Sequence, residues 1–283
     1  ASDSDAGEPG RRYLRIALIN DDMPFLVDSV AAAITGLGIA IDRLAHPIVP
    51  ALRDDDGRLV AVGDAQGGTG DAQPESMIYI ETQRVDARQR IELETLLHST
   101  LADVRIAVSD YPRMVELLNE DASKVDDVEG AELLRWFASG KLTQLGHITR
   151  KRDGSHAQVL GVCRRGAKAI LSDQSYDRAF AAFDDALADN ALRVPIAVKA
   201  NRMATVHRRV PLDLFLVPVV KDNAVVAISV HAGMWTSAAL SAAPGEVPRL
   251  REQVKVTGER FKFDPKGHTG KALNHAFSVL PYD

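Results

Sequence analysis

A short acidic segment, residues 20–26, has side chains that could bind a small charged ligand. It reads Asn-Asp-Asp-Met-Pro-Phe-Leu and stands between a strand-like and a helix-like stretch. A helix that begins here would present free backbone N–H groups to a carboxylate, and Asp21 or Asp22 could accept charge-assisted hydrogen bonds from an ammonium group. A free amino acid carries both groups on one carbon. The segment therefore predicts an amino-acid site formed by Asn20, Asp21, Asp22, Met23 and Phe25.

The same aspartates have a purely structural alternative. Asp and Asn are preferred at helix N-caps, where their side-chain oxygens accept hydrogen bonds from the first turn. An acidic group at this end also offsets the helix dipole. Pro24 fits the first turn, because that turn has no internal partner for its N–H groups. Capping would account for Asp21 and Asp22 without any ligand.

The other motifs of the chain predict no catalytic or metal site. Residues 263–272 resemble a phosphate loop, but the first glycine is missing at position 265 and Ala272 replaces the final Ser or Thr. The eight histidines form no H-E-x-x-H pattern, and no G-x-S-x-G or dinucleotide-binding glycine motif is present. The single cysteine, Cys163, lies in an apolar stretch and is interpreted as a buried, inert thiol.

The elements that would position the acidic segment follow a βαββα order. Alternating or periodic apolar residues predict strands over 14–19, 39–52, 59–62 and 77–85, and helices over 26–37 and 93–108. This order is most of the ferredoxin-like βαββαβ plan. The last strand is missing, because Tyr111-Pro112 leads into a further helical stretch over 113–118. An unpaired sheet edge results, which a partner chain or a second unit must cover.

A second unit is predicted after a polar, acidic linker over 119–130. A helix starts near residue 131, and a crossover helix covers 176–188. Five antiparallel strands with one crossover helix indicate a PAS/GAF-like domain over 131–240, preferred to a second ACT-like unit. Two helices, 247–260 and 271–279, form a connector over 241–283. The five predicted strands are 142–150, 156–163, 194–200, 212–220 and 224–231.

Composition narrows the class of protein. The chain has 283 residues, a net charge of −5 and 46% hydrophobic residues, which suits about two globular domains. The sequence lacks the excess of basic residues that would favour nucleic-acid binding, and it has no apolar run long enough to span a membrane. We therefore expect a soluble, cytoplasmic protein. Residues 1–12 read as a disordered leader, and the start at Ala1 without methionine suggests a piece of a longer chain.

A family resemblance unites these features. Residues 20–30, Asn-Asp-Asp-Met-Pro-Phe-Leu-Val-Asp-Ser-Val, resemble the N-terminal signature of the large bacterial NAD-specific glutamate dehydrogenases. Later segments resemble that family in the same order, and the match runs from about Tyr13 to Tyr282. Gln144 departs from the family pattern, which has an aromatic there, as does the pair Met203-Ala204. The later segments are 46–47, 131–137, 145–146, 199–201, 205–208, 236–239 and 270–273.

The resemblance implies an N-terminal regulatory region, with an ACT-like domain over 13–118 and a PAS-like domain over 131–240. The parent enzyme would convert L-glutamate, NAD and water to 2-oxoglutarate, ammonium and NADH. Its catalytic residues would lie outside this chain, which would itself hold neither NAD nor a metal. The implied partners are a free amino acid as effector, the enzyme's own catalytic domain and further copies of the chain. The alternative is an oligomerisation scaffold without a ligand. Weaker polar candidates in the second domain are Lys199, Asn201 and His207.

Overall fold

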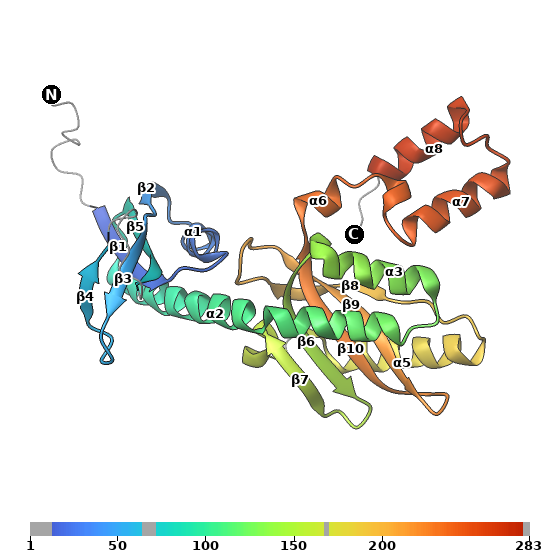
Figure 1. Cartoon of the computed structure of the whole chain (residues 1–283), viewed down its shortest axis with the longest axis horizontal. Helices are drawn as coiled ribbons and strands as arrows, with labels where there is room; N and C mark the ends of the chain where they lie inside the picture. Colours follow the sequence, from blue (N-terminus) through green and yellow to red (C-terminus); the bar gives the residue numbers. More distant parts are fainter. Residues whose placement is uncertain (1–12, 64–71, 167–169, 280–283) are drawn as a thin grey trace. The chain divides into compact units, whose positions relative to one another are not determined.

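The chain divides into two compact units, each built on an antiparallel sheet. The computed structural model describes residues 13–63, 72–166 and 170–279 (Figure 1). The first unit runs to Arg105 and also includes a loop, Ala204–Arg209, that returns from far along the chain. The second unit holds Ile106–Met203 and the residues from Val210 onward. The fold class is α+β, as predicted. The predicted leader, residues 1–12, lies outside the described residues.

The sheet of the first unit is organised around its longest strand, β5. On one side β5 pairs with β1, and on the other side it pairs with β2 and β3, while β4 extends the sheet beyond β3. The single strand predicted over 39–52 is two strands, because Pro47 interrupts it and accepts a hydrogen bond from the amide of Met77. The elements are β1 (Tyr13–Asp21), α1 (Leu26–Gly36), β2 (Ile41–Ala45), β3 (Ile48–Arg53), β4 (Leu59–Val62), β5 (Gln73–Gln83) and the first part of α2 (Ala87–Ser123).

Apolar periodicity explains the core of this unit. Leu26, Val30 and Ile34 recur at helical spacing on α1, and all three are almost fully buried. On β5, Ile78 and Ile80 alternate with more exposed residues, as in a strand that buries one face. The helices α1 and α2 and the sheet thus enclose one apolar layer.

Helix α2 is longer than predicted. It continues through Pro112 to Ser123, so the helical stretches predicted over 93–108 and 113–118 are one helix, and the linker predicted over 119–130 is reduced to the residues between Ser123 and Val128. Proline inside a helix costs about 3 kcal/mol, but the turns that follow it bury Met114 and Leu118 almost completely, which offsets that cost. The units also divide elsewhere than predicted, at Arg105 and not at residue 118.

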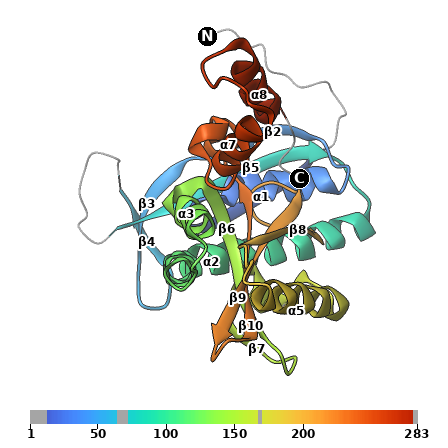
Figure 2. The same ribbon diagram turned by 90° about the vertical axis from the view of Figure 1, so that its right-hand side faces the viewer.

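The second unit is a five-stranded antiparallel sheet with helices on both faces. Its strand order is β7-β6-β10-β9-β8. Helix α5 lies against β9 and β10 on one face, and the end of α2 and α3 cover the other (Figure 2). The central strands are consequently buried on both faces. The elements are α3 (Val128–Trp136), η1 (Phe137–Lys141), β6 (Leu142–Lys151), β7 (His156–Gly161), η2 (Val162–Arg165), α5 (Asp173–Ala188), β8 (Ile196–Met203), β9 (Pro211–Lys221), β10 (Ala224–Trp235), α6 (Ser237–Leu240), η3 (Pro244–Glu246), α7 (Leu250–Phe261) and α8 (His268–Val279).

Candidate functional site

The loop between β1 and α1 holds the residues that the sequence singled out. Phe25 stands at the N-cap of α1 with φ 72°, in the left-handed region, and no side chain caps the helix. The expectation that Asn20, Asp21 or Asp22 supplies a cap oxygen is therefore wrong. The reason is geometric, since the helix begins at Leu26 and two residues lie between Asp22 and its N-cap, Phe25.

Asp22 ties the loop to the neighbouring strand. Its amide donates to the carbonyl of Pro74 at 3.0 Å, and its Oδ1 accepts from the hydroxyl of Ser76 at 2.5 Å. Ser76 Oγ lies 3.0 Å from Nε2 of His46. Because the Ser76 hydroxyl proton goes to Asp22, the Nε2 of His46 must carry the proton that completes this chain of hydrogen bonds. Asp21, the last residue of β1, has an exposed side chain.

Asn20 connects the same loop to the guanidinium of Arg105. Its side chain is 8% exposed. The amide Nδ2 donates to the carbonyl of Asp21 at 2.8 Å, and Oδ1 accepts from Nη2 of Arg105 on α2. Arg105 was not a sequence candidate, because nothing local connects it with residues far upstream. Met23, the fourth candidate here, is half-buried.

The loop Ala204–Arg209 closes over the start of α1. The amide of His207 donates to Oγ of Ser29 at 2.8 Å, and Nδ1 of His207 lies 3.0 Å from Oδ2 of Asp28. The ring of His207 faces that of Phe25, with the centroids 5.2 Å apart. His207 has φ 64°, so both residues of this ring pair adopt a left-handed backbone. Such conformations persist only where the surroundings hold them in place, and they often mark functional loops.

A second contact holds this returning loop in the first unit. Oγ1 of Thr205 donates to Oδ2 of Asp103 on α2 at 2.7 Å, and the Asp103 side chain is buried. Val206, between the two polar residues, is fully buried. The structure thus joins His207 to Phe25, two candidates that the sequence placed in different domains.

Lys199 and Asn201 belong to β8 in the second unit. Lys199 Nζ forms an ion pair with Oδ1 of Asp213 on β9, at 2.7 Å. Both β8 residues line a groove of about 570 Å³ beside the start of α5, together with Ser172 and Arg178. The side chain of Asn201 is exposed. The groove has apolar as well as polar lining residues, and Lys199 and Asn201 belong to the second unit whereas His207 belongs to the first.

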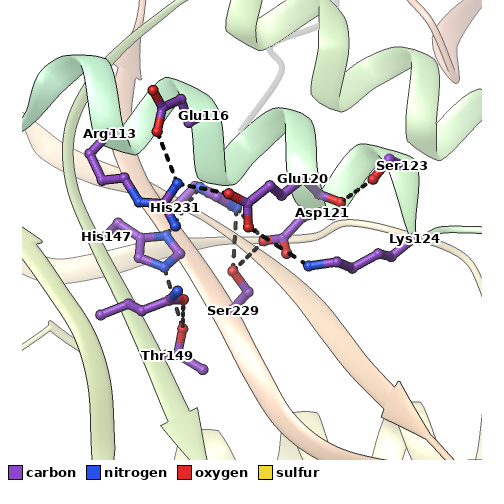
Figure 3. Close-up of polar contacts among 11 residues, drawn as sticks. Arg113, Glu116, Glu120, Asp121, Ser123, Lys124, His147, Thr149, Ser229 and His231 are labelled. Atoms are coloured by element: carbon purple, nitrogen blue, oxygen red, sulfur yellow. Dashed lines mark hydrogen bonds and ion pairs between the residues drawn. The ribbon is translucent and has the colours of Figure 1, made fainter.

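A buried polar network lies under the end of α2 (Figure 3). His231 Nε2 is 2.9 Å from Oδ2 of Asp121, and that same oxygen accepts from the hydroxyl of Ser229. On the other side of the ring, His231 Nδ1 faces Gln144 Nε2 at 2.9 Å and His147 Nδ1 at 3.3 Å. Since the two donors converge on His231 Nδ1, the His231 proton lies on Nε2 and points at Asp121.

Burial controls the charges of this network. It lowers the pKa of His147 to about 3, helped by the neighbouring His231, so the ring is neutral. Burial alone would raise the pKa of Asp121, but the hydrogen bonds from His231 and Ser229 hold it below its ordinary value. Asp121 is therefore a buried carboxylate that is stabilised by donors.

These residue types are those of a serine hydrolase, but the arrangement differs. In a triad the carboxylate orients one imidazole nitrogen while the other nitrogen faces the serine. Here Asp121 and Ser229 both lie on the Nε2 side of His231. Ser229 is 2% exposed and His231 is fully buried, so no substrate reaches them. The network therefore holds α2 on the sheet and is not a reaction centre.

Gln144 and Cys163 are also buried in this unit. Gln144, which stands where an aromatic was expected, is 3% exposed, and its Oε1 is buried without a hydrogen-bond partner. Burial raises the pKa of Cys163 to about 12, which agrees with an inert thiol. Within residues 13–63, 72–166 and 170–279, no three His, Cys, Asp or Glu side chains gather in a way that could hold a metal ion.

Comparison with known proteins shows which enzymes the chain is similar to. A family model described as "Glutamate dehydrogenase, ACT1 domain" matches residues 9–99. An NAD-specific glutamate dehydrogenase of Halomonas elongata is 28% identical over 287 residues, covering 95% of this chain and 18% of the relative. The chain is similar to NAD-specific glutamate dehydrogenases. The Pseudomonas aeruginosa enzyme is 25% identical over 96% of this chain, and the Mycobacterium tuberculosis enzyme 26% over 90%.

The chain spans only 16–18% of the length of the curated enzymes that it matches. Its ACT1 match covers β1 to the first turns of α2, which include the β1–α1 loop. The curated enzymes are NAD-specific by name. None of the helices that the structure describes is long and apolar enough to cross a membrane.

Proposed function

We propose that this chain is an amino-acid-sensing regulatory region of an NAD-specific glutamate dehydrogenase, with the effector bound at the β1–α1 loop. The observation that supports this most is the meeting of that loop with the loop 204–209, where Phe25 faces His207 in a strained backbone. Strained backbone that tertiary contacts over-determine is suited to a switch, because a ligand can release it.

The loop offers complementary charges to a free amino acid. Asp21 is exposed at the end of β1, and α1 begins at Leu26, where helical N–H groups suit a carboxylate. Arg105 donates from Nη2 to Oδ1 of Asn20, and its guanidinium has further donors for the same carboxylate. Asp21 then accepts the ammonium group. Asp22 is a weaker candidate than the sequence indicated, because Ser76 already donates to its carboxylate.

The loop 204–209 is a route by which binding would act on the rest of the chain. It leaves β8 at Met203 and enters β9 at Pro211, so a displacement of His207 pulls on both strands. Regulation of this kind is a coupling free energy, typically about 1–3 kcal/mol. Contacts that His207 makes only with the effector bound, or only without it, would supply this coupling free energy.

For the second unit we propose a PAS/GAF-like domain. Its five antiparallel strands, with α5 crossing between β7 and β8, support that interpretation over a second ACT-like unit. The helices α7 and α8 then form the connector to further chain.

For the whole protein we propose the reaction named by the relatives, oxidative deamination of L-glutamate with NAD as hydride acceptor, in the cytoplasm. No residue of this chain is assigned a role in that chemistry.

Calorimetric titration of the chain with a panel of free amino acids, including glutamate and aspartate, tests the sensing proposal. We expect one of them to bind saturably. Asp21→Asn should weaken that binding about tenfold or more, since it removes one charge-assisted contact. The matched control is Asp55→Asn, which changes an equally exposed carboxylate in the β3–β4 turn. A flat panel at millimolar ligand would contradict the proposal.

An oligomerisation scaffold is the second candidate. The observation that favours it is the edge of β1, which pairs with β5 alone among the described residues. Unpaired edges invite pairing with another chain. Solution mass is the test, and a chain that is monomeric at high concentration would contradict a scaffold role.

A further inference from the structure

The open edge of β1 has a defined set of unpaired backbone groups. In an antiparallel pair, alternate residues direct both N–H and C=O toward the partner strand. The amide of Asp22 donates to Pro74, so the even-numbered residues of β1 face β5. On the far side of β5, the amide of Met77 donates to Pro47, so the odd-numbered residues of β5 face away from β1. Both observations give the same alternation of residues that face toward and away from the partner strand.

The outward groups therefore belong to Arg15, Ala17, Ile19 and Asp21. The pairing of β1 with β5 has no register shift along its whole length, so the alternation is unbroken. These four side chains also share one face of the sheet, and all are exposed, Ile19 to 59%. Among the residues that the structure describes, this edge of β1 is unpaired, and an unpaired edge strand is a template for pairing with another chain.

An apolar groove runs along the same edge. It has a volume of about 390 Å³ and lies between β1 and the first turns of α2. Leu14, Ile16 and Leu18 form one wall, and residues of α2 form the other. The rim carries Arg90 and Glu94, so it has no strong preference for one sign of charge. The α2 wall is formed by Leu93, Leu97 and Leu101.

We propose that β1 pairs with β1 of a second copy of this chain, antiparallel, with Leu18 at the two-fold axis. In this register Arg15 of each copy faces Asp21 of the other, and Ala17 faces Ile19. Both pairs are of the hydrogen-bonded kind, because all four residues direct their backbone groups outward. The arrangement places opposite charges across the strands twice and covers the exposed Ile19 side chain.

Charge selects this register over its neighbour. Centring the axis on Ala17 also matches the outward groups, but it sets Arg15 opposite Ile19 and leaves Asp21 opposite Tyr13. Only the register centred on Leu18 pairs the two ionic residues of the strand. A two-fold interface of this kind is closed, so the chain forms dimers and not fibres. The inference rests on the assembly role proposed above. It uses Asp21, the carboxylate that the amino-acid proposal assigns to the effector, and Arg15→Asp therefore tests dimerisation without changing that carboxylate.

Sedimentation equilibrium of the 283-residue chain and its charge-reversed variants is the first test. We expect a dimer whose dissociation constant rises about tenfold or more in Arg15→Asp and in Asp21→Arg, because like charges then face each other. The double variant should restore dimerisation, because it exchanges the signs. Arg58→Asp, an exposed reversal in the β3–β4 turn, is the matched control. A monomeric wild-type chain, or reversals without effect, would overturn the proposal.

Disulfide formation tests the register itself. Residues opposite each other in a non-hydrogen-bonded pair have Cα atoms about 4.5 Å apart, within disulfide reach. Leu18→Cys should therefore form a covalent dimer on mild oxidation, whereas Val62→Cys, on the other edge of the sheet, should not. The native Cys163 is buried and does not interfere. Equal cross-linking of both variants would overturn the register.

Discussion

Phe25 and His207 lie far apart in the chain, yet their rings are 5.2 Å apart and each has a left-handed backbone, with φ 72° and 64°. Each conformation disfavours a side chain with a Cβ, by about 1–2 kcal/mol. Hydrogen bonds from α1 to His207 hold the pair together. The contact therefore stores strain in the β1–α1 loop, where we propose that the amino acid binds. A change in the conformation of either residue should alter that of the other.

Replacement of Phe25 separates strain from packing. Phe25→Ala and Phe25→Gly both remove the ring, but only glycine adopts φ 72° without strain. We expect the glycine variant to be more stable than the alanine variant by about 0.5–1 kcal/mol, in urea unfolding monitored by circular dichroism. The reverse order would show that the left-handed conformation is not kept in solution.

Two glycines with positive φ give a matched pair for close contact. Gly140 has φ 88° and open space around it, so Gly140→Ala should cost about 1–2 kcal/mol. Gly161 has φ 58°, and an added Cβ would overlap the carbonyl of Leu145 on the neighbouring strand. Gly161→Ala should therefore cost about 3 kcal/mol or more. Equal unfolding midpoints for the two variants would contradict this difference.

Asp127 joins α3 to the segments around it. It caps α3 through the amide of Gly130, accepts from the amide of Val194 at 3.0 Å, and receives the guanidinium of Arg249. Burial would raise the pKa of Asp127, but these donors hold it below its ordinary value. Asp127→Ala should cost about 2–4 kcal/mol in denaturant unfolding, because it removes the acceptor of two backbone amides and one ion pair of Arg249, which keeps only Val194 and Glu252. The neighbouring Asp126→Ala changes an exposed carboxylate and should have little effect.

The buried imidazole of His147 predicts an acid-sensitive fold. The pKa of His147 is lowered from 6.5 to about 3 by burial and by His231, so the unfolded chain binds this proton at a higher pH than the folded chain. The free energy of unfolding should therefore fall between about pH 6.5 and 3, by up to about 1.4 kcal/mol per pH unit. The variant His147→Asn should show a shallower dependence over pH 6–4 in urea titrations. An unchanged slope would contradict the assignment.

Much of the fold could be predicted from local patterns. The alternation and helical spacing of apolar residues predicted every strand of the second unit within a few residues, as well as α1, α5, α7 and α8. Such patterns report which face of an element is buried, and burial of that face stabilises the element wherever it packs. The break expected at Pro112 was wrong, because the local preference of proline was outweighed by the burial of Met114 and Leu118 further along the helix.

The candidate site, like the fold, could be predicted from the sequence only in part. The sequence by itself determined that residues 20–26 join a strand to a helix and that they are acidic, and it placed an unpaired edge in the first sheet. Only the tertiary structure decided that Phe25 occupies the N-cap position of α1, that Asp22 bonds to Ser76, and that His207 belongs beside them. Those outcomes depend on contacts between residues distant in the chain. Their free energies come from shared burial and paired hydrogen bonds, which no local sequence pattern records.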